Sequence, residues 1–152
     1  MSNIQAFLDM LAFSELGAGL LSKTKNGYNV LVGSTPDHPI TFNDYSKHPH
    51  VFNARFNSTA AGRYQFIFRT WEHYRIKLNL PDFSPTSQDL ACIEDLREHG
   101  AYEDILAGNI TKAIQRCCNE WASLPGGNSG QHQNKLSDLI AAYKAAGGAC
   151  GN

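Results

Sequence analysis

The chain has 152 residues, of which 42% are hydrophobic and 18% are charged, and its formal net charge is −1. This length and apolar content predict one globular domain with a sizeable core over residues 1–152, and they argue against intrinsic disorder. The nearly neutral charge gives no basic excess for binding nucleic acid. The apolar runs are too short to predict membrane insertion, and the N-terminus lacks the pattern of a secretory signal.

Cysteines and histidines give no sign of a metal or cofactor site. The four cysteines suit free thiols in a cytoplasm, and their spacing matches no zinc motif. The six histidines are scattered apart from His48 and His50, which flank a proline and are typical of a loop. We therefore expect neither a metal nor a cofactor.

The first predicted element is an amphipathic helix from Asn3 to Leu16, capped by Asn3 and ended by Gly17 and Gly19. A small β-rich region is expected next, over about residues 24–57. It opens with the turn signal Asn26-Gly27, after which apolar side chains alternate.

The second half of the chain reads as helical. Ser84 is expected to cap one helix, with Pro85 at its first position, Gly100 at its end and Leu90 on its inner face. The predicted helices are Phe66–Asn79, the segment between Ser84 and Gly100, a short turn ended by Gly108, a helix from Ile110 closed by Pro125, and a last helix within residues 134–148. Because helices and strands are segregated along the chain, the fold class is α+β, with a small antiparallel sheet and a helical bundle.

Glu15 is the residue that departs from the pattern of the first helix. Ile4, Leu8 and Leu11 form an apolar stripe, and Glu15 is the next member of that series, within about 20° of the middle of the stripe. The helix could fray before Ser14 and turn the carboxylate to solvent. Alternatively, partial burial and the negative end of the helix dipole raise its pKa, which suits a general acid.

The segment "STAAGRYQF", Ser58–Phe66, combines small residues with groups that suit a sugar. Gly62 and its small neighbours let the backbone approach a ligand closely. Donors, acceptors and a flat ring come from Ser58, Thr59, Arg63, Tyr64 and Gln65. The same segment also reads as an ordinary helix start, and Arg63 could brace it through an ion pair.

Six stretches in the same order carry a resemblance over nearly the whole chain, from Ala6 to about Gly148. They are "AFLDMLAFSE", "GYNVLVG", "FNDYSKHP", "STAAGRYQF", "DFSPTSQD" and "WASLPGG". Together they resemble the lambda-type lytic transglycosylases, also called the lambda lysozymes. The resemblance implies a lysozyme-like fold that is mostly helical, with a small antiparallel β-lobe and a cleft between two lobes.

The same resemblance implies roles for individual residues. Glu15 matches the single catalytic glutamate of the family. The residues expected to bind substrate are Tyr45, Ser58, Thr59, Gly62, Tyr64 and Gln65.

The implied reaction is cleavage of the β-1,4 bond between N-acetylmuramic acid and N-acetylglucosamine in peptidoglycan. In the transglycosylase route Glu15 acts first as acid and then as base, and the product is a 1,6-anhydromuramic end. A hydrolytic muramidase would need a second carboxylate, for which Asp44 and Asp37 are available, although Asp44 also reads as a turn residue. Asn29 stands where the lambda enzyme has an aspartate, so a carboxylate is not expected there. A wall-binding module without turnover is the third possibility.

The resemblance also implies a biological setting. The chain is expected to be a phage endolysin that waits in the host cytoplasm until a holin opens the membrane. It then acts in the periplasm on the glycan strands of the cell wall. A monomer is expected, without nucleic acid or membrane insertion.

Overall fold

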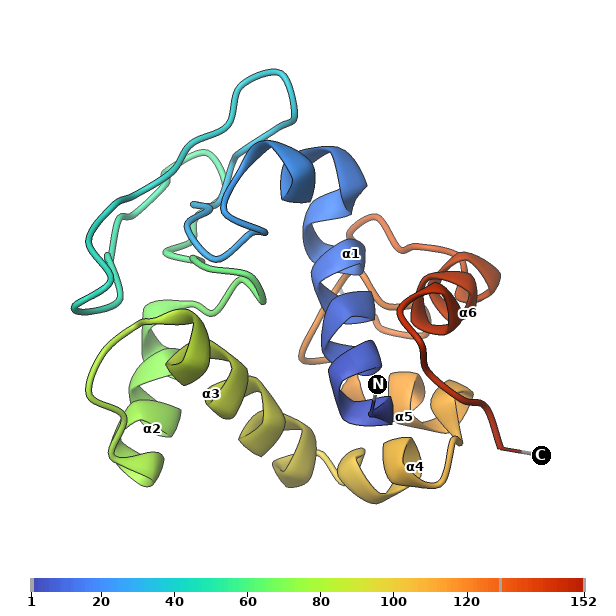
Figure 1. Cartoon of the computed structure of the whole chain (residues 1–152). Coiled ribbons are helices and arrows are strands. Elements are labelled where there is room, and N and C mark those ends of the chain that lie inside the picture. Colours follow the sequence, from blue (N-terminus) through green and yellow to red (C-terminus); the bar gives the residue numbers. More distant parts are fainter. Residues whose placement is uncertain (1, 129, 152) are drawn as a thin grey trace. The chain divides into compact units, whose positions relative to one another are not determined.

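The structure is a computed structural model that describes residues 2–128 and 130–151. The chain forms two compact units. The first contains the residues up to Glu15 and those from Ile93 onward, and the second is Leu16–Cys92. The helices of the described residues, labelled in Figure 1, are α1 (Asn3–Lys23), α2 (Phe68–Leu78), α3 (Pro85–Glu98), α4 (Tyr102–Leu106), α5 (Ile110–Cys117) and α6 (Leu136–Ala145).

Helix α1 consists of two helical runs with a break between them. Gly17 has φ 77° and ψ 156°, outside the helical region, so the first run ends at Leu16 as predicted. The second run continues to Lys23, which the sequence analysis missed.

The length of α1 also corrects the expectation about apolar runs. Its 21 residues have a window of mean hydropathy 1.3, enough by length and composition to cross a membrane. Half of that window is buried inside the protein. The absence of membrane insertion therefore stays a prediction.

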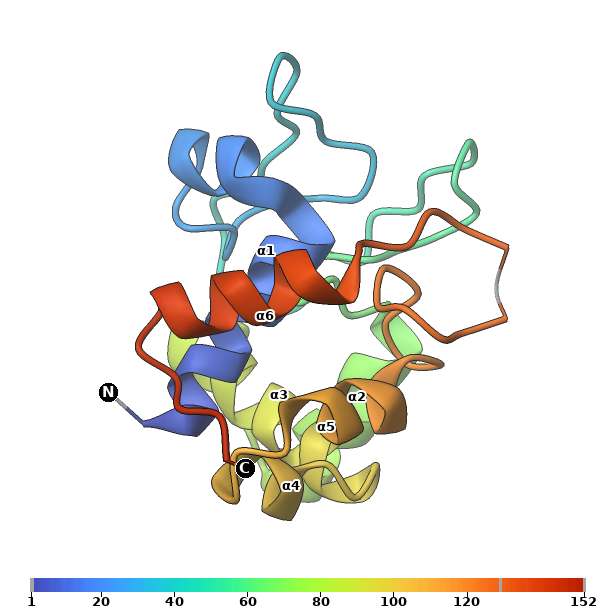
Figure 2. The same cartoon turned by 90° about the vertical axis from the view of Figure 1, so that its right-hand side faces the viewer.

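In the first unit, α5 packs against α4 and α6, as Figures 1 and 2 show. Asn3 does not cap α1 as predicted. The Oγ of Ser2 accepts a hydrogen bond from the N–H of Gln5 (3.1 Å), so Ser2 fills that role. The Asn3 side chain instead donates to Ile105 O (3.1 Å) and accepts from the N–H of Ala149 (3.0 Å), which ties α1 to α4 and to the C-terminal segment.

Helix α5 ends at Cys117, well before the predicted end at Pro125. The N–H groups of Glu120 and Trp121 both bond to Cys117 O, at 2.9 and 3.0 Å, and the chain turns there. The predicted apolar stripe nevertheless continues through the turn, because its members are all buried: Ile110, Ala113, Ile114, Cys117 and Trp121. The four cysteines are free thiols, and only Cys150 is exposed.

The second unit corrects the predicted antiparallel sheet. Between α1 and α2 the described chain contains no β-strand, and Figure 1 draws it as a continuous loop. Antiparallel pairing is limited to isolated bridges: Val30 with Thr41, Leu31 with Ala61, Asn53 with Ser58, and Ala61 with Phe66. The expected β-lobe over residues 24–57 is thus a set of loops joined at single bridges.

The bridges do not extend because the backbone repeatedly leaves the extended region. The predicted turn does form: Asn26 and Gly27 have φ of 53° and 84°, and Tyr28 N–H donates to Lys25 O (3.0 Å). Farther along, Gly33 has φ 92°, and positive φ values recur at His50, Asn57 and Gln65. Each such residue turns the chain away from its neighbour before a ladder can form.

Helix α2 and the part of α3 up to Cys92 complete the second unit. Helix α2 begins at Phe68, two residues later than predicted, because Phe66 still pairs with Ala61. Helix α3 starts at Pro85 as predicted, and Ser84 Oγ accepts from the N–H of Ser87 (3.3 Å). Leu90 was wrongly assigned to the inner face, since 47% of it is exposed.

Candidate active site

Glu15 occupies the last turn of the first helical run of α1, and its carboxylate has a partner from far along the chain. Ser123 Oγ donates a hydrogen bond of 2.5 Å to Glu15 Oε2. Ser123 lies in the turn that follows α5, which brings together two residues more than a hundred positions apart. Helix α1 does not fray before Ser14, so the solvent-facing alternative for Glu15 is wrong.

A chain of hydrogen bonds fixes Ser123. The Nδ2 of Asn134 donates to Ser14 O (2.9 Å) and to Ser14 Oγ (3.0 Å), and Ser14 Oγ lies 2.8 Å from Ser123 Oγ. A hydroxyl has one proton. Because Ser123 uses its proton on Glu15, Ser14 must donate to Ser123. The donors therefore all point toward the Glu15 carboxylate.

Burial raises the pKa of Glu15 from its ordinary value of 4.5 to about 7, and the hydrogen bond from Ser123 opposes the rise. Loss of hydration disfavours the charged carboxylate, whereas a donated hydrogen bond stabilises it. A carboxyl group with a pKa near neutral can both give and take a proton under cellular conditions. Glu15 thus has the properties of a general acid and base.

Asp44 and Asp37, the possible second carboxylates, are exposed side chains of the second unit. Asp44 Oδ1 accepts from the N–H of Ser46 (2.9 Å), which makes it a turn residue. Hydrogen bonds from Ser46 lower the pKa of Asp44, so this carboxylate is ionised at neutral pH.

Tyr64 was predicted to bind substrate, and the structure contradicts this. Its side chain is 0% exposed, so it offers no surface to a sugar. Its hydroxyl donates to Asp89 Oδ1 (2.5 Å) and accepts from Arg63 Nη1 (3.2 Å). Arg63 also donates from Nε to Asn26 O (3.0 Å), so it braces this segment through hydrogen bonds, and the expected ion pair stays a prediction.

Gly62 is also buried, and the groups that lie close to its backbone are core side chains of the protein. Its φ is +84°, and a Cβ there would lie 2.9 Å from Phe83 Cζ and closer still to Gln88 Oε1. The prediction of a glycan contact at Gly62 is therefore wrong, because its neighbours in the core fill the space.

The remaining predicted substrate residues are partly exposed: Tyr45, Ser58, Thr59 and Gln65. Several of them also hold the local fold. Ser58 Oγ accepts from the N–H of Ala60 (3.0 Å), and Thr59 Oγ1 accepts from the N–H of Phe68 (2.9 Å) at the start of α2. Glycan contacts by these four residues stay predictions, as does the cleft between lobes.

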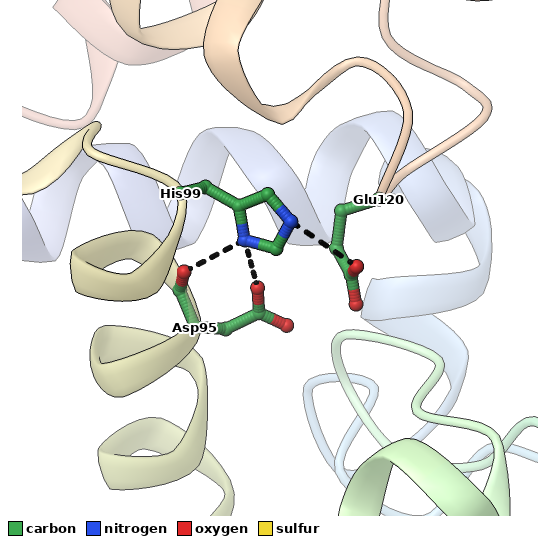
Figure 3. A group of neighbouring side chains, drawn as sticks. All are labelled: Asp95, His99 and Glu120. Atoms are coloured by element: carbon green, nitrogen blue, oxygen red, sulfur yellow. Dashed lines mark hydrogen bonds and ion pairs between the residues drawn. The ribbon is translucent and has the colours of Figure 1, made fainter.

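A group of residues that could hold a metal ion also lies in the first unit, although no spacing in the sequence predicts a metal site. Asp95, His99 and Glu120 place one possible ligand atom each within 4.8 Å of one another, as Figure 3 shows. Asp95 and His99 are four residues apart at the end of α3. Glu120 comes from the turn after α5, a pairing that no local motif could reveal.

Comparison with known proteins identifies the family. The family model described as Endolysin matches residues 5–150. The chain is 51% identical to the endolysin of Escherichia phage P2, covering 96% of this chain and 93% of that protein. It is 48% identical to the endolysin of Escherichia phage lambda, covering 95% and 90%.

The chain belongs to the endolysin family. Among solved structures it is similar to bacteriophage lambda lysozyme in complex with a chitohexasaccharide, with a TM-score of 0.87 and 46% identity over 97% of this chain and 96% of that one. Family membership makes the chain a peptidoglycan-degrading enzyme of phage lysis, with a lambda-lysozyme fold.

Replacing Tyr64 by Ala is expected to destabilise this endolysin by about 3–5 kcal/mol, because the substitution empties a fully buried ring site and leaves Asp89 with only one of its two tyrosine hydroxyl donors, Tyr28. Urea unfolding followed by circular dichroism measures this loss. A variant that kept its stability but bound glycan weakly would restore Tyr64 as a substrate residue.

Replacing Glu15 by Gln is expected to raise stability at neutral and alkaline pH. A carboxyl group with a raised pKa costs nothing while it is protonated in both states, and its cost grows as the pH rises through the interval between the unfolded and folded pKa values. The variant should match the wild type below about pH 4.5 and gain up to roughly 3 kcal/mol above about pH 7. Urea titrations at several pH values measure the difference, and equal stabilities at pH 8 would contradict the raised pKa of Glu15.

Proposed function

We propose that this endolysin is a lytic transglycosylase, which cleaves the bond between N-acetylmuramic acid and N-acetylglucosamine and leaves a 1,6-anhydromuramic end. The observation that carries the proposal is the Glu15 carboxyl group, whose pKa of about 7 and single hydrogen bond from Ser123 suit a group that works in both protonation states.

In the first step the protonated Glu15 donates its proton to the glycosidic oxygen, and the bond from that oxygen to C1 of the muramic residue breaks. The carboxylate that results keeps the hydrogen bond from Ser123, which stabilises its new charge. The pKa near neutral keeps a useful fraction of Glu15 protonated before this step.

In the second step the Glu15 carboxylate takes the proton of the C6 hydroxyl, and O6 bonds to C1 of the same sugar. The positive charge at C1 is neutralised, and Glu15 regains the proton that it lost. No water enters the product. One carboxyl group is sufficient for this cycle, in contrast to the pair that hydrolytic glycosidases use.

The proposed substrate is the glycan strand of the host cell wall. The related lambda lysozyme structure contains a chitohexasaccharide, so a protein 46% identical to this chain binds an oligosaccharide. We also propose that the enzyme acts as a monomer, remains in the host cytoplasm until a holin releases it, and then works in the periplasm. These proposals rest on family membership.

Glu15→Gln is expected to lose at least about 100-fold in lytic activity, because the amide cannot donate the proton that the leaving group needs. The measurement is the loss of turbidity of permeabilised Gram-negative cells. Asp44→Asn, a matched change from carboxylate to amide at an exposed turn, serves as the control and should keep most of the activity. Near-native lysis by a folded Glu15→Gln protein would refute the proposed role of Glu15.

Digestion of purified peptidoglycan in water enriched in heavy oxygen distinguishes the two reactions. Attack by the C6 hydroxyl gives unlabelled anhydromuramic ends, lighter by one water than a hydrolysis product. Activation of water by Asp44 or Asp37 would give labelled reducing ends. Mass spectrometry of the released muropeptides should show the unlabelled product. Labelled ends as the main product would replace the transglycosylase by a hydrolytic muramidase.

A further inference from the structure

Asp95, His99 and Glu120 form an ionic cluster within the first unit. His99 lies between the two carboxylates, as Figure 3 shows. Its Nδ1 is 2.8 Å from Asp95 Oδ1 and 2.9 Å from Asp95 O, and its Nε2 is 3.5 Å from Glu120 Oε2. The Asp95 side chain is fully buried, whereas those of His99 and Glu120 are partly exposed. The cluster therefore links the end of α3 to the turn after α5.

We propose that Asp95, His99 and Glu120 are positioning residues that hold the turn after α5 in place, so that Ser123 reaches Glu15. The inference rests on the proposed function, because it concerns the control of Glu15 as acid and base.

The turn between Cys117 and Leu124 carries both contacts. Glu120 faces His99, and three residues later Ser123 donates to Glu15. Helix α5 has already ended, so no continuing helical ladder fixes this turn. Trp121, between the two contact residues, is 3% exposed and anchors the turn in the core. A shift of Glu120 is therefore transmitted to Ser123 through only two residues, Trp121 and Ala122, the first of which is held in the core.

Each ring nitrogen of His99 faces a different carboxylate, at 2.8 Å from Asp95 Oδ1 and 3.5 Å from Glu120 Oε2. A metal ion takes one ring nitrogen of a histidine, so this arrangement favours a link between α3 and the turn through the imidazole ring over a metal site. A buried carboxylate such as Asp95 needs a polar neighbour, and His99 lies beside it.

Cys117, on α5, also faces the cluster. Burial, followed by the charges of Asp95 and Glu120, keeps the pKa of its thiol far above the usual range, so it remains neutral. It adds no negative charge that would compete with the two carboxylates for His99.

The proposal predicts an effect on the pH profile as well as on the rate. The hydrogen bond from Ser123 lowers the pKa of Glu15, so weakening it must raise that pKa. The alkaline limb of kcat/KM reports the loss of the general acid proton in the free enzyme. A loosened turn should therefore move this limb to higher pH.

The experiment compares Ser123→Ala, Glu120→Gln, His99→Gln and the double variant Ser123→Ala/Glu120→Gln in assays of muropeptide release over a range of pH. Arg97→Gln is the matched control, since Arg97 is an exposed residue of α3 that pairs with Glu94. Glu120→Gln and His99→Gln should lower kcat about three- to tenfold, with the alkaline limb shifted upward and KM unchanged. Ser123→Ala should give a larger shift of the same sign. Arg97→Gln should behave as the wild type.

The double variant tests whether Glu120 influences Glu15 through Ser123. If Glu120 acts through Ser123, the double variant should be no slower than Ser123→Ala by more than about twofold. The positioning role would be overturned if the loss of kcat in the double variant were the product of the two single losses. It would also be overturned if Glu120→Gln and His99→Gln lowered the melting temperature but left the pH profile unchanged. A melting temperature that Zn²⁺ raises in the wild type but not in His99→Gln would also overturn it, in favour of a metal site.

Failure of the proposed function has a different signature. Labelled reducing ends in heavy-oxygen water would show a hydrolase in which Glu15 is still the acid, and the positioning role would stand. If Glu15 is not the acid at all, Glu15→Gln would keep its activity and Ser123→Ala would leave the pH profile in place. A shifted profile in Ser123→Ala alone, with wild-type profiles for Glu120→Gln and His99→Gln, would refute only the positioning role.

Discussion

The hydrogen bond between Ser123 and Glu15 is the contact on which the proposed chemistry depends. Burial without this donor would raise the Glu15 pKa further. A fully hydrated carboxylate would be ionised at neutral pH and could not act as an acid. Partial burial raises the pKa of Glu15, and the hydrogen bond from Ser123 lowers it. The resulting pKa is about 7, at which both the protonated and the ionised carboxyl group are populated near neutral pH.

The environment that sets the pKa of Glu15 is built from several segments of the first unit. The apolar stripe of α1 sets the face on which Glu15 lies, and Leu8 and Leu11 on that face are 1% and 0% exposed. The partner arrives from the turn after α5, and Asn134 fixes Ser14 beside it. Three separate segments therefore converge on one carboxyl group, which explains why the local sequence around Glu15 is insufficient to define its environment.

In the second unit, side-chain hydrogen bonds hold the loops in place. With pairing limited to single bridges in its described loops, side chains take over much of the backbone bonding. Gln88 illustrates this: its Nε2 donates to Tyr28 O and Phe83 O, at 3.1 and 2.9 Å, and its Oε1 accepts from the N–H of Arg63 (3.0 Å). A fully buried amide with both ends occupied fixes three chain segments at once.

The sequence by itself determined the features that depend on neighbours along the chain. The break at Gly17, the Ser84 and Pro85 start of α3 and the turn at Asn26-Gly27 follow from glycine conformations, capping and fixed proline geometry. The resemblance of six stretches supplied the family and singled out Glu15. Long-range packing decided the rest. Burial of Tyr64, the early end of α5 and the reach of Ser123 to Glu15 all depend on residues far away in the sequence, and no local pattern specifies which distant side chain fills a given space.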